Sequence, residues 1–291
     1  MTILVTGATG TIGKQVLANL VGKGAEIHAL TRDPAKAALP TGVMPVKGEM
    51  LDVGAMRAAL KAASTLFLLN AVSADELTQA MLTLNLAREA GIKRVVYFSV
   101  FNAETFTNVP HFTGKHAVER MITDLGIPTT ILRPNCFMQN DLWLKAAITG
   151  HGVYPFPIGG KGVSMVDVRD IGEIAALALL ARENGDVMPT EVLNLSGPDT
   201  LTGAGNATVW SEVLGKSVAY PGDDTARFEA QMGAHGPSWA AMDMRLMLDR
   251  FQQDGMAASA ADTDKLTTRL GRKLRTYRAF AEETASQWQK G

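Results

Sequence analysis

Short apolar runs alternate with longer amphipathic stretches through the first two thirds of the chain. An apolar run of about four to eight residues between turn residues is typical of a buried strand, and apolar residues three or four apart are typical of a helix. Such runs predict strands at residues 3–5, 26–30, 43–46, 65–69, 94–98, 128–132 and 192–195. Because helical patterns separate most of them, we predict an α/β fold, a Rossmann-type doubly wound parallel sheet with helices on both faces.

The pattern changes after the sixth predicted strand. Residues 143–162 combine aromatic, proline and glycine residues, including Trp143 and Tyr154, and we expect this irregular stretch to wall a pocket. Beyond residue 196 the apolar spacing is mostly helical. We therefore predict a dinucleotide-binding domain of residues 1–135, to which residues 163–196 return, and a smaller, mostly helical substrate domain of residues 136–162 and 197–291.

The first predicted strand leads directly into a glycine-rich turn at residues 7–13. Gly7 permits a tight turn, Gly10 lets the main chain approach a bound group, and Gly13 lets the following helix pack near the strand. The start of that helix presents unpaired N–H groups to an anion such as a pyrophosphate. A purely structural glycine turn is the alternative, but this context favours a dinucleotide site. The expected contacts are Gly7, Thr9, Gly10, Thr11 and Ile12.

The end of the second predicted strand bears on the choice of cofactor. An acidic residue at this place usually binds the ribose 2′-hydroxyl of NAD, whereas an arginine accommodates the 2′-phosphate of NADP. Arg32 occupies the place, and Asp33 beside it is a rival. Asp33 followed by Pro34 is, however, also a common start of a helix. We therefore predict NADP(H) in preference to NAD(H).

Further cofactor contacts are expected where the other strands end, because ligands of parallel sheets bind at the carboxyl ends of the strands. Glu49 and Met50 follow the third strand and are expected near the adenine. The remaining expected contacts are Asn70 and Ala71 after the fourth strand, Lys115 at the start of the helix that follows the fifth, and Asn135 and Phe137 after the sixth.

Composition narrows the classes of partner and compartment. The net charge of the 291 residues is −1 and the basic residues are scattered, which argues against nucleic acid or an anionic membrane as partner. The longest apolar run, residues 174–181, is too short to span a bilayer, and the first strand begins too early for a signal peptide, so we expect a cytoplasmic protein. The expected oligomeric state is a monomer or a homodimer. Cys136 is the only cysteine, and the histidines show no zinc-type spacing, so we expect no disulfide and no metal.

Three stretches of the chain resemble one known family. They are Val-Thr-Gly-Ala-Thr-Gly-Thr-Ile-Gly at 5–13, Leu-Arg-Pro-Asn at 132–135 and Ser-Met-Val-Asp-Val-Arg-Asp-Ile at 164–171. They look like the NmrA-like branch of the atypical short-chain dehydrogenases, and the resemblance covers nearly the whole chain. Within this branch the chain is most similar to NADPH-dependent quinone reductases and triphenylmethane reductases. The branch also contains non-catalytic redox sensors.

The resemblance also implies candidate catalytic residues. The wider family uses a serine and a Tyr-x-x-x-Lys motif, in which the tyrosine donates a proton to a carbonyl while the lysine lowers the tyrosine pKa and holds the ribose. Ser99 and Lys115 match this pattern, but His111 stands where the tyrosine belongs, just before the predicted helix. A histidine can donate a proton because it titrates near neutral pH, although His111 also fits a surface position at a helix cap. Cys136 as a nucleophile is a weaker alternative, since no base is evident beside it.

We expect an NADPH-dependent reductase that transfers hydride to a quinone, a dye or a similar conjugated small molecule. Such acceptors need little acid catalysis, and the protein mainly holds the nicotinamide against the substrate and excludes water. A non-catalytic NADP(H)-binding redox sensor is the alternative.

Overall fold

The computed structural model describes residues 1–185 and 188–290, and the chain divides into two compact units. Unit 1 comprises Met1–Glu104, His111–Arg133 and Val168–Leu193. Unit 2 comprises Thr105–Pro110, Pro134–Asp167 and Asn194–Gly291. No helix within residues 1–185 and 188–290 has the length and apolar character needed to cross a membrane.

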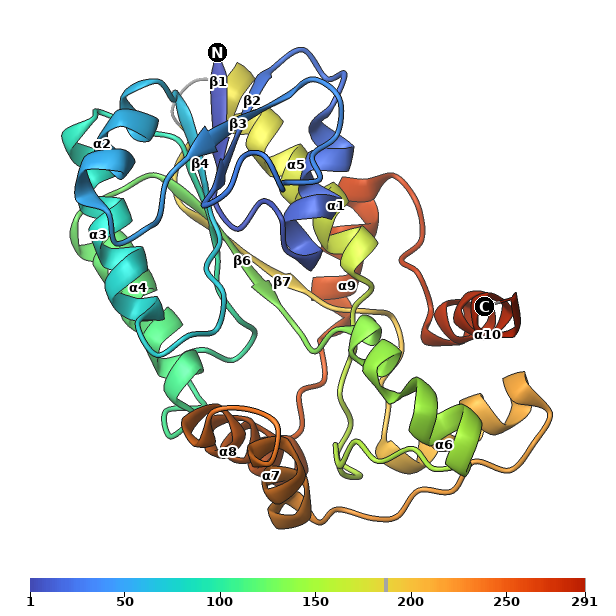
Figure 1. Cartoon of the computed structure of the whole chain (residues 1–291). Coiled ribbons are helices and arrows are strands. Elements are labelled where there is room, and N and C mark those ends of the chain that lie inside the picture. Colours follow the sequence, from blue (N-terminus) through green and yellow to red (C-terminus); the bar gives the residue numbers. More distant parts are fainter. Residues whose placement is uncertain (186–187, 291) are drawn as a thin grey trace. The chain divides into compact units, whose positions relative to one another are not determined.

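Unit 1 is built on a seven-stranded sheet of order β3-β2-β1-β4-β5-β6-β7 (Figure 1). All pairings among β1 to β6 are parallel. The central strands are buried on both faces, which explains why they read as continuous apolar runs. The predicted Rossmann-type fold is confirmed. The strands are β1 (Thr2–Val5), β2 (Glu26–Thr31), β3 (Val43–Lys47), β4 (Thr65–Leu68), β5 (Val95–Phe98), β6 (Thr129–Pro134) and β7 (Glu191–Leu195).

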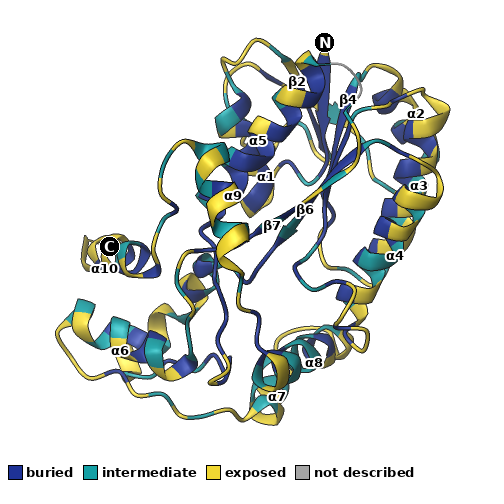
Figure 2. Cartoon of the chain, turned by 180° about the vertical axis from the view of Figure 1, so that it is seen from behind, coloured by how far each residue is buried: buried dark blue, intermediate teal, exposed yellow. Residues whose placement is uncertain are grey.

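Helices cover both faces of this sheet. The helices α1 (Thr11–Leu20) and α5 (Val168–Asn184) lie on one face, and α2 (Val53–Lys61), α3 (Glu76–Glu89) and α4 (Pro110–Asp124) lie on the other (Figure 1). Their buried residues turn toward the strands (Figure 2). The helices α1 and α5 pack closely because Gly172 has no side chain: a Cβ atom there would lie 2.4 Å from Cβ of Gln15.

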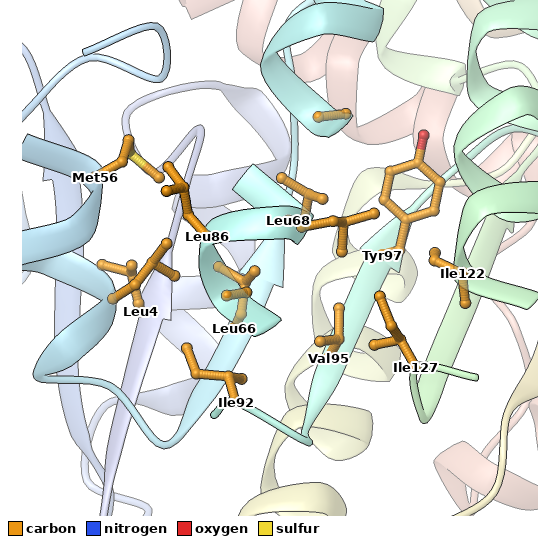
Figure 3. Packing of buried hydrophobic residues seen from close by; sticks show 14 of the residues in the cluster. Leu4, Met56, Leu66, Leu68, Leu86, Ile92, Val95, Tyr97, Ile122 and Ile127 are labelled. Atoms are coloured by element: carbon orange, nitrogen blue, oxygen red, sulfur yellow. The ribbon is translucent and has the colours of Figure 1, made fainter. Parts of the chain in front are cut away.

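An apolar cluster joins the sheet to α2, α3 and α4 (Figure 3). Leu4, Leu66 and Val95 come from three neighbouring strands, and Met56 and Ile122 come from α2 and α4. Burial of each large apolar side chain stabilises the fold by roughly 1.5–3 kcal/mol. The cluster therefore fixes the strands whose carboxyl ends carry the candidate site.

Two local expectations about helix starts are wrong. Residues 34–36 form a turn, so Asp33 and Pro34 do not begin a helix; Pro40 and Gly42, which lie before β3, leave little room for one. The helix α4 begins earlier than expected, at Pro110, because proline suits the first turn of a helix. His111 therefore lies inside the first turn rather than before the helix, and Lys115 lies in the second turn.

Unit 2 is mostly helical. A 3-10 helix (Met138–Leu144) and a π-helical turn (Ala146–Gly150) follow β6. Tyr154 is fully buried, whereas Trp143 in the same stretch is 86% exposed. That this stretch walls a pocket stays a prediction. Tyr154 faces inward because its hydroxyl finds a buried carboxylate partner in Asp141, at 3.0 Å. The longer helices are α6 (Gly203–Leu214), α7 (Thr225–Gly233), α8 (Ser238–Asp254), α9 (Ala260–Leu270) and α10 (Tyr277–Lys290).

Candidate functional site

The candidate site lies in unit 1, where the strand order reverses between β1 and β4. Ligands of open α/β sheets bind outside the carboxyl ends of the strands at this switch point. The Thr6 hydroxyl ties the two strand ends together, since it donates to the Leu69 carbonyl oxygen at 2.9 Å and accepts from the Leu69 N–H at 2.8 Å. The turn that follows Thr6 is thereby held at the carboxyl edge of the sheet.

The three glycines of this turn have different roles. Gly7 has a φ of +61°, and a Cβ atom there would lie 2.8 Å from Cγ of Leu69. A Cβ atom at Gly13 would lie 2.2 Å from the Gly7 carbonyl oxygen, so α1 begins in direct contact with the turn. At Gly10 the nearest atom is 3.3 Å away, again the Gly7 oxygen. Gly7 and Gly13 therefore shape the fold, whereas the missing side chain of Gly10 leaves space for a ligand.

The start of α1 fits an anion. Gly10 is the N-cap residue, no side chain caps the helix, and the first turn contains no acidic residue. Thr9, Gly10 and Thr11 are exposed. The first N–H groups of a helix have no partner within the helix, and the helix dipole adds a partial positive charge. A diphosphate group would satisfy both, so the expected contacts of residues 7–12 agree with the local geometry.

A hollow of about 340 Å³ lies at the ends of β2 and β3. Arg32 and Lys47 line it, together with Gly48, Glu49, Asp52 and Ala55. Asp33, the rival for cofactor recognition, is engaged locally: its carboxylate accepts from the Ala35 N–H at 3.2 Å and pairs with Lys36 at 3.2 Å. These contacts favour Arg32 over Asp33 as the group that meets the ribose.

Asn70, which follows β4, has a buried side-chain oxygen that could accept a hydrogen bond from a ligand. The side chain is 6% exposed, and its amide N–H₂ donates to Oε1 of Gln79 at 3.2 Å and reaches Sδ of Met50 at 3.5 Å. Its Oδ1 atom has no hydrogen-bond partner among the described residues. A buried unsatisfied acceptor costs about 1–3 kcal/mol, and a hydroxyl of a bound nucleotide would satisfy it. Asn70 and Met50 thus fit the nucleotide, and Ala71 is exposed beside them.

Ser99 is buried at the end of β5 and is engaged with an acidic residue. Its hydroxyl donates to Oε1 of Glu119 at 2.5 Å. The Arg133 guanidinium forms a bidentate contact with the same carboxylate: Nε donates to Oε1 of Glu119 at 2.9 Å, and a terminal nitrogen donates to Oε2 at 2.5 Å. A serine has a single hydroxyl hydrogen, so Ser99 does not donate to a substrate while this contact is in place.

Lys115 is also buried and paired. Its ammonium group donates to Oε1 of Glu76 at 2.5 Å and lies 3.5 Å from the Phe98 carbonyl oxygen. The structure thus brings Ser99 and Lys115 to the same end of β5, with Glu119 one helical turn after Lys115. An ammonium group has three hydrogens, so the predicted ribose contact of Lys115 is compatible with its pairing to Glu76.

His111 lies one turn before Lys115 on α4 and is half-buried. Its ring meets the Phe112 ring edge-on, with centroids 4.7 Å apart.

We expect His111→Phe to lower kcat only severalfold and to leave the pH profile intact, because a conjugated acceptor needs no strong acid in the hydride step. Measurement of kcat against pH for both proteins tests this. A loss on the order of a hundredfold, with one limb of the profile gone, would instead identify His111 as the general acid.

The expected contacts after β6 belong to unit 2. The Asn135 amide donates to the Met256 carbonyl oxygen at 2.7 Å, and its Oδ1 accepts from the Cys136 N–H at 2.8 Å. Asn135 therefore has internal partners, and Phe137 is half-buried beside it. A cofactor contact of either residue stays a prediction. Burial raises the pKa of the Cys136 thiol to about 12, so this cysteine is not a thiolate nucleophile at neutral pH.

Sequence reasoning missed Glu76, Glu119 and Lys47. Glu119 follows Lys115 by four residues, a spacing that places both on one helix face and was available in the sequence. Lys47 ends β3 and so shares the carboxyl edge of the sheet with Arg32. Glu76 gives no comparable signal, because its contact with Lys115 depends on how α3 and α4 pack.

A parallel sheet of this strand order, with a glycine turn at its switch point, defines the class of dinucleotide-binding α/β proteins. Within this class the chain belongs to the NmrA-like family, whose sequence model matches residues 1–279.

Its relatives include reductases. The NAD(P)H azoreductase of Xenophilus azovorans is 28% identical over 290 residues, with 98% of each chain covered. The (4-alkanoyl-5-oxo-2,5-dihydrofuran-3-yl)methyl phosphate reductase of Streptomyces griseus is 31% identical over 290 residues, which cover 97% of this chain and 98% of the relative. The structure of the NADPH-dependent quinone oxidoreductase QOR2 from Escherichia coli, complexed with NADPH, is 25% identical with a TM-score of 0.84, over 97% of this chain and 99% of that one. These comparisons confirm the predicted family and support the predicted class of NAD(P)H-dependent reductase and its NADP(H) cofactor.

Proposed function

We propose that this protein is an NADPH-dependent reductase that transfers hydride to a conjugated small molecule such as a quinone or an azo or triphenylmethane dye. The observation that carries the choice of acceptor is the contact between Ser99 and Glu119. In the wider family the serine and the tyrosine are the hydroxyl groups that face the substrate carbonyl. Here the Ser99 hydroxyl donates to a carboxylate and His111 stands at the tyrosine position, so neither hydroxyl is available as a proton donor. An electron-poor acceptor that takes hydride before it takes a proton suits such a site.

The residues of unit 1 have distinct tasks in this proposal. The N–H groups after Gly10 bind the diphosphate, Asn70 accepts from a hydroxyl, Arg32 binds the 2′-phosphate and Lys115 contacts the second ribose. Bound NADPH would supply a hydride, which is equivalent to two electrons and one proton. Its transfer to a quinone would give a hydroquinone anion, and this anion would take its second proton from water. The pairs Lys115–Glu76 and Ser99–Glu119 fix these side chains around the end of β5.

An activity panel tests the function. The purified protein is mixed with NADPH and, in turn, with quinones, azo dyes and triphenylmethane dyes, and oxidation of NADPH is followed by absorbance. We expect turnover with at least one class of acceptor and little with simple ketones, which need protonation. Tight NADPH binding with no turnover on any acceptor would favour the redox sensor.

Arg32→Ala tests the cofactor. Loss of a charge-assisted contact to the 2′-phosphate should weaken NADPH binding by about 1.5 kcal/mol, roughly tenfold, and leave NADH binding nearly unchanged. Calorimetric titration of both cofactors measures this difference. An equal loss for both cofactors, or tighter binding of NADH than of NADPH by the parent protein, would contradict the assignment.

A further inference from the structure

The hollow at the ends of β2 and β3 holds a second cation in addition to Arg32. In the parallel pairing of these strands Thr31 is the partner of Lys47, and the Gly48 N–H donates to the Thr31 carbonyl oxygen at 3.0 Å. The residues that follow Thr31 and those around Lys47 therefore run side by side. Both Arg32 and Lys47 line the hollow, and both are exposed.

The charged residues that line this hollow differ in whether they already have a partner in the protein. Asp52 accepts from the Ala55 N–H at 3.0 Å as the N-cap of α2. Arg32, Lys47 and Glu49 form no ion pair with any residue in the part of the chain that the structure describes. The formal charges of the four charged residues that line the hollow balance, since Asp52 keeps its charge while it caps α2. Arg32 and Lys47 are nevertheless available to an anionic ligand, because neither is held by an ion pair within the described residues.

Gly48 packs closely against the residues beneath the hollow. A Cβ atom there would lie 2.9 Å from Cδ1 of the buried Leu30 and 3.5 Å from Cβ of Ala55, so the missing side chain allows this close packing between Lys47 and Glu49. Ala55, which also lines the hollow, contributes only a methyl group. The uncharged residues that line the hollow are therefore small.

We propose that Lys47 is a second phosphate-binding cation beside Arg32, and that Glu49 opposes both, so that Lys47 and Glu49 together set the ratio of NADPH to NADH affinity. The inference rests on the proposed cofactor. A phosphate monoester carries about −1.5 to −2 charges at neutral pH, more than one guanidinium neutralises. Glu49 repels such a phosphate, whereas its carboxylate accepts a hydrogen bond from the free 2′-hydroxyl of NADH.

The test uses variants in which one charged side chain is replaced by the uncharged glutamine, and calorimetric titration measures their affinity for each cofactor. Lys47→Gln should weaken NADPH binding about threefold to fivefold and leave NADH unchanged, the size expected for an exposed charge pair. Glu49→Gln should strengthen NADPH binding about threefold and weaken NADH binding, since its carboxylate is lost. Lys61→Gln is the matched control, because Lys61 is an exposed lysine at the other end of α2 and does not line the hollow.

A fragment separates this inference from the proposed function. Adenosine 2′,5′-bisphosphate carries the phosphate but no nicotinamide, so its binding is independent of hydride transfer. AMP is the matched fragment, because it lacks only the 2′-phosphate. Lys47→Gln should weaken the binding of adenosine 2′,5′-bisphosphate about threefold to fivefold and leave the binding of AMP unchanged. An unchanged affinity of Lys47→Gln for adenosine 2′,5′-bisphosphate, or equal losses for this fragment and for AMP, overturns the role of Lys47. A parent protein that binds AMP at least as tightly as adenosine 2′,5′-bisphosphate overturns the proposed cofactor itself.

Discussion

Gly10→Val should reduce NADPH binding by a hundredfold or more while the protein stays folded. The valine side chain would occupy the space that Gly10 leaves at the start of α1, where the nearest atom to a Cβ is the Gly7 oxygen at 3.3 Å. Loss of two charge-assisted hydrogen bonds to the diphosphate costs about 3–6 kcal/mol, which corresponds to at least roughly a hundredfold. Calorimetric titration measures the binding, and circular dichroism measures the fold.

Gly13→Val provides the contrast. Its Cβ atom would lie 2.2 Å from the Gly7 carbonyl oxygen and 2.7 Å from Cα of Ala8, both main-chain atoms that cannot move aside. This variant should therefore lower the melting temperature, whereas Gly10→Val should not. Normal NADPH affinity in Gly10→Val would show that the turn does not hold the phosphates.

Asp141→Leu should destabilise unit 2 by about 3–5 kcal/mol. Asp141 is fully buried and its carboxylate accepts three hydrogen bonds: from the Tyr154 hydroxyl at 3.0 Å, from Nε1 of Trp210 at 3.1 Å and from the Tyr277 hydroxyl. Leucine leaves these donors without their shared acceptor, although Tyr277 still accepts from Trp210 at 3.0 Å. Urea unfolding followed by circular dichroism measures the loss.

The same carboxyl group makes stability depend on pH. Burial raises the pKa of Asp141 to about 6, and the hydrogen bonds from Tyr277, Trp210 and Tyr154 only partly oppose this. Since the pKa of an unfolded aspartate is about 3.9, the folded state prefers the protonated acid. Its contribution to stability is complete below about pH 4 and declines by about 3 kcal/mol as the pH rises through 6.

Asp141→Asn is the control, because the amide does not titrate. The difference in unfolding free energy between Asp141→Asn and the parent should therefore shift in favour of the variant as the pH rises from about 4 to 6. Subtraction removes the titration of other groups that the two proteins share. A difference that stays constant across this range would show that Asp141 keeps an ordinary pKa in the folded protein.

Local patterns were sufficient to predict the sheet and the cofactor turn. The apolar runs marked each strand to within two residues, and the central strands read most clearly because strands covered on both faces are almost entirely apolar. The turn from Gly7 to Gly13 was equally readable, since Gly7 and Gly13 each answer a local steric demand that the structure shows.

Contacts between distant segments were beyond such reasoning. Nothing near Ser99 in the sequence indicates that Glu119 accepts a hydrogen bond from its hydroxyl, because this contact forms only when β5 and α4 pack together. The burial of Tyr154 is a second example, because its neighbours in the sequence are aromatic, proline and glycine residues that do not indicate which side chains face inward. Its inward orientation depends on Asp141, which in turn takes hydrogen bonds from residues 210 and 277.

The tryptophans are distributed very unevenly between the two units. All four, at positions 143, 210, 239 and 288, belong to unit 2. Trp210 is fully buried and stacks on Trp288 with ring centroids 4.9 Å apart and planes 12° from parallel. Indole emission therefore reports on unit 2 alone, and the stacked pair should give an exciton couplet in the far-ultraviolet, where the indole transition is strong. The unit that carries the glycine turn contains no tryptophan, so a tryptophan introduced there would give it an indole signal of its own.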